Sequence, residues 1–459
     1  MKTTSANKKQ NDATYGTIFR LFLPEFITAL LLYSVPFWLD AYFISHLNST
    51  TTYATLGASN NFLNMITKIG EAFSVSAIII SGQLNGREEY EEAGYAARDV
   101  IGITGILGLL MAAFLYAGAP LIYRWHGFSE QMIAQGIPFM RLRALSVLFM
   151  FLFFAGIGFL RGIKNTRVPM KIFIAGTIVF VLLDYGLIFG KFGLPAMELR
   201  GSALASVVQY GGMLAVVMGY IFFNPKMAKY RSRLFSGILR PAYFKRIASI
   251  SWPIVIDKAV LAGAYIWLCK MICPMGECGV ATYSVVKDME RFAFLPAIAL
   301  AHVVTLLASN DYGCGNWDGI KSNIRRILFL ASGMVFVILV AFSLRPEPII
   351  RIFDRTGEFT GFAAQVFPLL SVLVFFDLLQ LILSGALRGV GNTKTVMIVR
   401  LAVCFGFFVP LSYSIAHSAI ENQTLKFLLI YGSFYLGNAL MSLVYIGKFR
   451  RDKWKQSSL

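Results

Sequence analysis

Charged residues are scarce in this sequence, and their scarcity excludes a soluble domain of useful size. They make up 14% of the 459 residues, whereas soluble globular domains carry about 25%. The longest polar stretch between apolar runs is 224–246, which is too short to form such a domain. The mean hydropathy of +0.64 instead indicates that most of the chain lies in lipid.

Metal-ligating and nucleophilic residues are also sparse. The chain has five Cys and four His, and the cysteines form no paired CxxC set of the kind that binds zinc. No nucleophile–base pair, phosphate-binding loop or metal-ligand spacing occurs, so we expect no enzymatic activity, no metal site and no cofactor. The net charge of +18 is spread over short loops and both ends of the chain, which argues against a nucleic-acid partner.

Long apolar segments are the dominant feature of the sequence. A membrane span needs about 20 predominantly apolar residues, and twelve segments of the chain qualify. These segments are 16–45, 53–82, 99–120, 131–160, 170–190, 201–223, 247–273, 280–308, 326–344, 359–387, 395–416 and 425–447. We therefore expect an all-α membrane protein with twelve transmembrane helices and the lipid bilayer as a partner. The first segment is longer than a signal-peptide core, so we expect it to be kept as a span.

The distribution of basic residues orients these spans. With the N-terminus in the cytoplasm, the inner loops and ends hold 27 Lys and Arg residues and the outer loops hold 10. This asymmetry satisfies the positive-inside rule, and the even number of spans places both termini in the cytoplasm. We expect a multi-pass, monomeric protein of the plasma membrane, in a bacterium the inner membrane.

An internal repeat divides the chain into two halves. Residues 160–170 read LRGIKNTRVPM and residues 387–397 read LRGVGNTKTVM, with six of eleven positions identical at an offset of 227. The same offset pairs Gln83 with Asn310, and Pro24 pairs with Pro253 at an offset of 229. We therefore expect two six-helix lobes, 1–223 and 247–459, joined by a cytoplasmic linker over 224–246. Because six is even, a pseudo-twofold axis along the membrane normal should relate the lobes.

These motifs resemble the multidrug and toxic compound extrusion (MATE) family. Both repeat copies fit the family's L-R-G-x-x-[DN]-T segment at the end of the fourth span of each half. The run LDYGLIFG at 183–190, followed by GSALA at 201–205, resembles the family's fifth and sixth spans. Pro24, with Asp40 sixteen residues later, resembles its first span. The resemblance covers nearly the whole chain, and it implies a transporter with the twelve-helix fold.

The sequence departs from the family pattern at two positions. In one proton-coupled arrangement of the family, an Asn lies one turn before the carboxylate that matches Asp184, and here that residue is Phe180. Many members carry a Glu eight residues after the proline of the seventh span. Here that residue is Leu261, and Asp257 lies one turn earlier. Both departures put the family's polar network in doubt at these positions.

Four aspartates inside the predicted spans are the candidate functional residues: Asp40, Asp184, Asp257 and Asp377. Each costs about 2.5–3.5 kcal/mol at the centre of a membrane, which argues for a use or a partner. We assign cation coupling to Asp40 and Asp184. Asp257 and Asp377 each lie about 16 Å along a helix from a basic end, so we place both in one cavity for substrate or a second cation. The competing interpretation is that each aspartate is a structural residue, bonded to water or to a neighbouring helix.

Three further residues are expected to support the cavity. Pro36 has no N–H and frees the carbonyl group of Leu32, one turn before Asp40. Glu71 lies three residues after Lys68, a spacing that suits an ion pair. His302 is the third, although a buried histidine is more often a bonded core residue.

Together these features predict an ion-coupled antiporter that exports organic cations or amphiphilic drugs by alternating access. The coupling ion would be sodium or a proton. The alternative is a lipid-linked saccharide or lipid flippase, which needs a basic cavity for a pyrophosphate, whereas these spans carry more acids. A membrane transferase would need a catalytic loop, and a channel would not need two mobile lobes.

Overall fold

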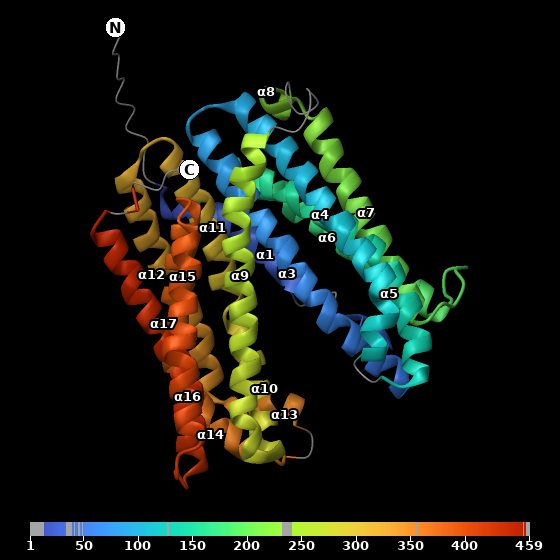
Figure 1. Ribbon diagram of the computed structural model, residues 1–459, viewed down its shortest axis with the longest axis vertical. Helices are drawn as coiled ribbons and strands as arrows, with labels where there is room; N and C mark the ends of the chain where they lie inside the picture. Colours follow the sequence, from blue (N-terminus) through green and yellow to red (C-terminus); the bar gives the residue numbers. More distant parts are fainter. Residues whose placement is uncertain are drawn as a thin grey trace. The chain divides into compact units, whose positions relative to one another are not determined.

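The computed structural model describes residues 13–33, 39–40, 42–44, 46–47, 49–125, 128–231, 241–354, 357–452 and 454–455. All of the regular structure in these ranges is helical (Figure 1). Pro36, one of the residues expected to support the cavity, lies outside the described residues. The first half contains α1 (Tyr15–Tyr33), α3 (Thr50–Gly86), α4 (Tyr90–Trp125), α5 (Glu130–Gly162), α6 (Arg167–Phe189), α7 (Leu199–Phe223), η1 (Pro225–Met227) and α8 (Ala228–Arg231). The second half contains α9 (Pro241–Ile272), η2 (Cys273–Met275), α10 (Gly276–Ala293), α11 (Leu295–Gly313), α12 (Trp317–Leu344), α13 (Pro346–Phe353), α14 (Thr360–Gly389), α15 (Thr393–Val403), η3 (Cys404–Phe408), α16 (Val409–Ala416) and α17 (Gln423–Arg450).

Helices occur at all twelve predicted segments, so the predicted all-α membrane fold is confirmed. Within the described ranges, eleven helical stretches are long and apolar enough to cross a membrane, and one of them, Phe244–Ala293, combines α9 with α10. The predicted span 280–308 is divided between α10 and α11, which meet at Phe294. Pro296 explains the interruption, because its ring and its missing N–H disfavour a continuous helix.

Contacts within the chain define two compact units. One consists of Pro24–Lys258 and is called the N-terminal unit below. The other combines Met1–Leu23 with Ala259–Leu459 and is called the C-terminal unit. Two helices, α1 and α9, therefore contribute residues to both units, and each of them contains one of the paired prolines, Pro24 or Pro253.

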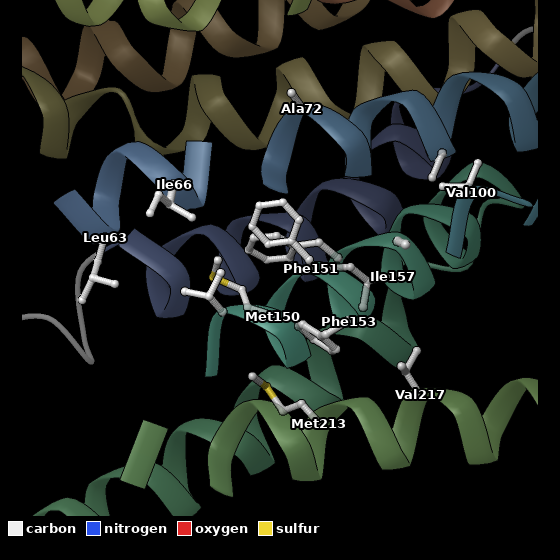
Figure 2. Packing of buried hydrophobic residues seen from close by; sticks show 14 of the residues in the cluster. Leu63, Ile66, Ala72, Val100, Met150, Phe151, Phe153, Ile157, Met213 and Val217 are labelled. Carbon is white, nitrogen blue, oxygen red and sulfur yellow. The ribbon is translucent and has the colours of Figure 1, made fainter. Parts of the chain in front are cut away.

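The helix α5 is the centre of the N-terminal unit and packs against α3, α4, α6 and α7. Its side chains Phe151, Phe153 and Phe154 are fully buried. Figure 2 shows Phe151 and Phe153 among residues of the neighbouring helices, including Met213 and Val217 of α7. Because lipid is as apolar as these side chains, close packing rather than exclusion from water holds such helices together.

The helix α14 has the same place in the C-terminal unit. It packs against α10, α11, α12, α13, α15 and α17. Phe367, Leu370, Leu378 and Ile382 of α14 are fully buried, at positions that follow one face of the helix. Both α5 and α14 carry the predicted repeat at their C-terminal ends, so the repeat marks the central helix of each unit.

Paired glycines let each central helix approach its neighbour closely. A Cβ atom on Gly158 of α5 would lie 2.5 Å from the backbone oxygen of Ser74 and 2.7 Å from Cβ of Ala77 on α3. A Cβ atom on Gly385 of α14 would lie 3.0 Å from the backbone oxygen of Ala301 on α11. Glycine is needed at such crossings because only a missing side chain lets two backbones meet.

The second glycine of each pair continues the same crossing one turn later. A Cβ atom on Gly162 would lie 2.8 Å from Cβ of Ser81, and one on Gly389 would lie 2.6 Å from the backbone oxygen of Thr305 and 2.9 Å from Cβ of Ala308. Each glycine of α5 is separated by 227 residues from its counterpart in α14. The same separation relates the residues they face, Ser74 with Ala301 and Ser81 with Ala308. The repeat is therefore a repeat of packing as well as of sequence.

A folded-back segment follows the last long helix of the N-terminal unit. The ring of Tyr230, in α8, lies 5.5 Å from that of Tyr90 and 5.6 Å from that of Phe159. The hydroxyl group of Tyr230 donates a hydrogen bond of 2.6 Å to Oδ1 of Asn85. Burial and the neighbouring Tyr90 raise the pKa of Tyr230. Residues of the predicted linker thus pack firmly onto the start of α4.

An equivalent segment follows the last helix of the C-terminal unit. The side chain of Trp454 is fully buried. Its ring lies 5.5 Å from that of Trp317 and 5.6 Å from that of Phe449. The amide group of Asn392 donates a hydrogen bond of 3.3 Å to the backbone oxygen of Trp454. Trp317 stands 227 residues after Tyr90, so both units use the same position to hold the segment that follows their last helix.

Candidate functional site

The candidate site of the N-terminal unit begins with a close approach between α6 and α7. A Cβ atom on Gly201 would lie 2.7 Å from the backbone oxygen of Leu187, so only glycine fits at this point. The next residue, Ser202, is 1% exposed. Its hydroxyl group donates a hydrogen bond of 2.7 Å to Oδ1 of Asp40. The glycine thus lets α7 place a hydroxyl group next to a buried carboxylate.

Aromatic contacts hold the segment of Asp40 against α6. The ring of Phe43 lies 5.7 Å from that of Tyr185 and 6.3 Å from that of Phe189. Asp40 itself is 9% exposed. These contacts fix the carboxylate in the interior, where a charge is costly unless a partner balances it.

Asp184, on α6, is the second carboxylate of this site. It is completely buried, and among the described residues neither of its oxygens accepts a hydrogen bond. Asp40 and Arg143 act on it electrostatically, and the hydroxyl group of Ser202 lies close to it. The structure therefore brings together Asp40 and Asp184, the two residues assigned to cation coupling, around one serine.

Arg143 is a site residue that sequence reasoning missed. Its guanidinium group donates a hydrogen bond to Oγ of Ser206, one turn after Ser202 on α7. It is also an electrostatic neighbour of both Asp40 and Asp184. It lies in the middle of α5, inside the predicted span 131–160. A basic residue inside an apolar run is the signal that would have identified it.

Glu25 is a second missed residue. Its Oε1 atom accepts a hydrogen bond of 2.9 Å from Nε of Arg161, and the two side chains are 1% and 7% exposed. Arg161 belongs to the repeat motif, and its guanidinium group is buried in an ion pair with α1. A buried pair of this kind is strongly destabilising to break from one side.

The candidate site of the C-terminal unit contains Asp377 on α14. Its Oδ1 atom accepts a hydrogen bond of 3.1 Å from the amide group of Asn438 on α17. Arg400 of α15, which is 5% exposed, acts on Asp377 electrostatically. Arg400 and Asn438 were not identified from the sequence, although Arg400 is a basic residue within a predicted span.

A cavity lies beside this group. It has an empty volume of about 270 Å³ including its open side. The residues that matter for its chemistry are Leu261, Arg400, Cys404, Phe408 and Asn438. Its wall includes η3, a π-helical turn, and such turns are frequent at functional sites. Leu261 stands in this wall, so the position where many MATE proteins carry a Glu faces the cavity with an apolar side chain.

The remaining predicted site residues are Asp257, Glu71 and His302. Asp257 is 2% exposed on α9. It belongs to the N-terminal unit and Asp377 to the C-terminal unit, and their shared cavity remains a prediction. Glu71 is bound by Lys68, whose Nζ atom lies 3.0 Å from its carboxylate, as the spacing predicted. His302 is half-buried on α11.

Each unit thus holds a carboxylate inside an apolar helix bundle, beside a hydrogen-bond donor and a guanidinium group. Such a group can bind a small cation or a proton, because either one removes a buried negative charge. Among the described residues, no group of three or more His, Cys, Asp and Glu side chains is arranged to hold a metal ion. The duplicated helical fold and these sites define a multi-pass membrane transporter.

Comparison with known proteins identifies the family. The MatE family model matches residues 26–186 and 253–414, which together make up more than half of the chain. The chain therefore belongs to the MatE family, as the repeat motifs predicted. Each matched range covers one copy of the repeat.

Individual relatives agree with this assignment. The chain is 27% identical to a probable multidrug resistance protein NorM of Thermotoga maritima over 257 residues, which are 55% of this chain and 54% of that protein. It is 23% identical to a probable multidrug resistance protein NorM of Rhizobium meliloti over 417 residues, 88% of each chain. A solved structure described as the outward-facing conformation of a multidrug resistance MATE family transporter of the MOP superfamily matches with a TM-score of 0.87 at 18% identity, over the whole of both chains. This last match confirms the fold.

Proposed function

We propose that the protein is an ion-coupled antiporter that exports organic cations or amphiphilic drugs. Membership of the MatE family and relatives named as multidrug resistance proteins support this function. The observation that carries it is the pair of buried carboxylates, Asp40 and Asp184, on either side of Ser202. In an apolar interior, two such groups form a site that a sodium ion or a proton would fill.

Ion binding is coupled to the conformational change by the free-energy cost of two buried carboxylates without a bound cation. Two carboxylates around one hydroxyl group repel each other, and burial removes the water that would screen them. A bound sodium ion or proton removes part of this negative charge. A conformation that encloses the site is then stabilised relative to one that opens it, and this difference in free energy is what shifts the equilibrium between inward-facing and outward-facing states.

Substrate binding is assigned to the other two aspartates. Asp377 can supply a negative charge for an organic cation beside the cavity that Arg400 and Asn438 line. Asp257 would act with it as a substrate or second-cation residue. In this scheme residues 1–223 and 247–459 work as two lobes, 224–246 links them on the cytoplasmic side, and the protein functions as a monomer with both termini in the cytoplasm.

A lipid-linked saccharide or lipid flippase is the second candidate, and the two arginines beside the candidate aspartates favour it. Arg143 and Arg400 could bind the pyrophosphate of such a lipid. However, Arg143 acts on Asp40 and Arg400 acts on Asp377. Because each base is balanced by a carboxylate, neither site has the excess positive charge that a pyrophosphate needs. The antiporter is therefore the better supported function.

Transport by purified protein in liposomes tests the proposal. Uptake of cationic dyes is measured under a sodium gradient and then under a proton gradient, for wild type and for Asp40→Asn. We expect one gradient to drive dye uptake, and the Asp40→Asn variant to lose about tenfold or more of the driven rate while equilibrium dye binding is retained. Dye that moves under neither gradient, together with translocation of a lipid-linked saccharide, would establish the flippase instead.

A further inference from the structure

A cluster of tyrosines surrounds a buried carboxylate in the C-terminal unit, next to the site of Asp377. Glu290 of α10 is 9% exposed. Its Oε2 atom accepts a hydrogen bond of 2.7 Å from the hydroxyl group of Tyr431 on α17. Its Oε1 atom is buried and accepts no hydrogen bond from any described residue. One carboxylate oxygen is thus fixed in place by Tyr431, and the hydroxyl group of Tyr435 also acts on the carboxylate.

The rings around Glu290 come from three helices. The ring of Tyr431 lies 5.9 Å from that of Tyr283 on α10 and 5.6 Å from that of Tyr435, one turn along α17. Tyr265 of α9 joins the group, because its backbone oxygen accepts a hydrogen bond of 3.0 Å from the hydroxyl group of Tyr283. Tyrosine rings attract organic cations to their faces, most strongly where water is excluded.

One cation already occupies these ring faces. The Nζ atom of Lys287 lies 5.0 Å from the ring centroid of Tyr265 and 5.6 Å from that of Tyr283. Both distances are within the range of about 6 Å over which an ammonium group interacts with an aromatic ring. Lys287 is three residues before Glu290, a spacing that permits an ion pair. The ammonium group nevertheless lies over the rings, and the structure has no ion pair between these two residues.

We propose that this cluster is a binding site for an organic ammonium ion, and that Lys287 is its tethered occupant. A substrate cation takes the ring faces of Tyr265 and Tyr283 and pairs with the carboxylate of Glu290, while the lysine side chain moves away. This inference deepens the proposed function, on which its relevance to transport rests, by naming a binding site for the organic cation and the residue that competes with it. It predicts that the lysine weakens binding of every organic cation by occupying the site.

The test is equilibrium binding of ethidium, a quaternary ammonium dye, to the purified full-length protein by fluorescence anisotropy. Lys287→Met keeps the length of the side chain and removes its charge, so we expect about fivefold tighter binding, because the fraction of empty sites rises. Glu290→Gln should weaken binding about tenfold. Lys287→Arg keeps a cation at the rings and should bind as wild type does, which also shows that position 287 tolerates substitution.

A matched variant separates competition from bulk charge. Lys270 is exposed in the same unit, with its Nζ atom 5.7 Å from the ring centroid of Trp267. Lys270→Met therefore removes the same charge without touching the tyrosine cluster, and its ethidium affinity should stay at the wild-type value. Equal gains for Lys270→Met and Lys287→Met, or weaker binding by Lys287→Met, would overturn the proposal.

Gradient-driven ethidium transport is measured in parallel, so that this inference and the antiporter function can fail separately. Driven transport by wild type, with unchanged affinity in Lys287→Met, removes the tethered occupant and leaves the antiporter. The expected affinity changes without any driven transport support the binding site and remove the antiporter. A neutral dye, 1-N-phenylnaphthylamine, should bind equally well to wild type and to Lys287→Met.

Discussion

In the N-terminal unit Gly158 of α5 meets Ser74 of α3, and in the C-terminal unit Gly385 of α14 meets Ala301 of α11. The residues that meet at the first crossing correspond to those that meet at the second, at an offset of 227 residues in the sequence. The helices that cross differ, however, because α3 is continuous where α10 and α11 are separate. Ile69 of α3 corresponds to Pro296, the residue that accounts for the interruption.

Unlike the glycine crossings, the polar site residues of one unit are not repeated in the other. At the same offset, the site residues Asp184, Ser202 and Arg143 correspond to Leu411, Leu429 and Leu370. In the other direction Asp377, Arg400 and Asn438 correspond to Met150, Phe173 and Gly211. Each polar site therefore exists in one unit only.

This difference separates what supports the fold from what performs the function. A glycine crossing has one geometric solution, because any side chain at the contact forces the backbones apart. A buried charge needs only a local partner, so it can be gained in one unit without disturbing the other. In the proposed function the two units share a scaffold and divide the chemistry, with the cation-coupling site in one and the substrate site in the other.

The largest effect expected from this division of labour is on transport. Asp184→Asn should reduce gradient-driven dye uptake about tenfold or more and leave dye binding unchanged, because it removes a charge from the coupling site. Asp377→Asn should do the reverse and weaken dye binding while coupling to the ion is retained. Uptake and binding measured on the same preparations check both variants. If Asp377→Asn abolishes coupling and Asp184→Asn weakens dye binding, the two units have the opposite roles.

The shared scaffold can be broken at either crossing. We expect Gly158→Ala and Gly389→Ala each to destabilise the protein by about 1–3 kcal/mol, because the new Cβ atom would lie 2.5 or 2.6 Å from a backbone oxygen of the facing helix. The melting temperature in detergent measures the effect. Gly219→Ala and Gly333→Ala are matched helical controls, since nothing lies within 4 Å of either Cβ position. If these controls lose as much stability as the crossing variants, close approach is not what glycine provides.

The smallest effect expected is at the turn after each central helix. Both turns make a bond of 2.9 Å, from Asn165 N to Leu160 O and from Asn392 N to Leu387 O. The left-handed position is Lys164 in the first turn (φ 63°) and Gly391 in the second (φ 91°). Lys164→Gly should therefore raise stability by up to about 1 kcal/mol, because glycine adopts this conformation without strain.

The reverse substitution is the control for that turn. Gly391→Lys should lower the melting temperature by a similar amount, since it places a side chain where the C-terminal unit has none. A drop in melting temperature for Lys164→Gly would show that the lysine side chain stabilises the turn through other contacts.

The fold could be predicted from the sequence because its signals are local. Twelve apolar segments and one repeated motif are visible without any knowledge of contacts, and the glycines of the crossings stand next to that motif. The interruption at Phe294 was missed because the hydropathy of 280–308 is continuous across Pro296. Local composition therefore predicts where helices occur, and it is less reliable in predicting where a helix is interrupted.

The candidate sites were only partly predictable. Asp40, Asp184 and Asp377 were identified because an acid in an apolar run is conspicuous. Their partners were not, because Ser202 and Asn438 are unremarkable until the fold decides which helix faces meet. Arg143 and Glu25 lie well inside the predicted spans 131–160 and 16–45, so the reasoning that identified the aspartates would have identified them too. The proposed roles of all four aspartates, of Glu71 and of His302 stay predictions.

The folded-back segments after α7 and α17 pack in similar ways, and this similarity bears on how the two halves arose. Tyr230 packs on Tyr90, and Trp454 packs on Trp317, the equivalent residue of the second half. The connection between the halves is thus built like the end of the protein. Duplication of an ancestral gene, followed by fusion of the two copies, produces this arrangement, because the tail of the first copy becomes the linker and keeps its old docking position.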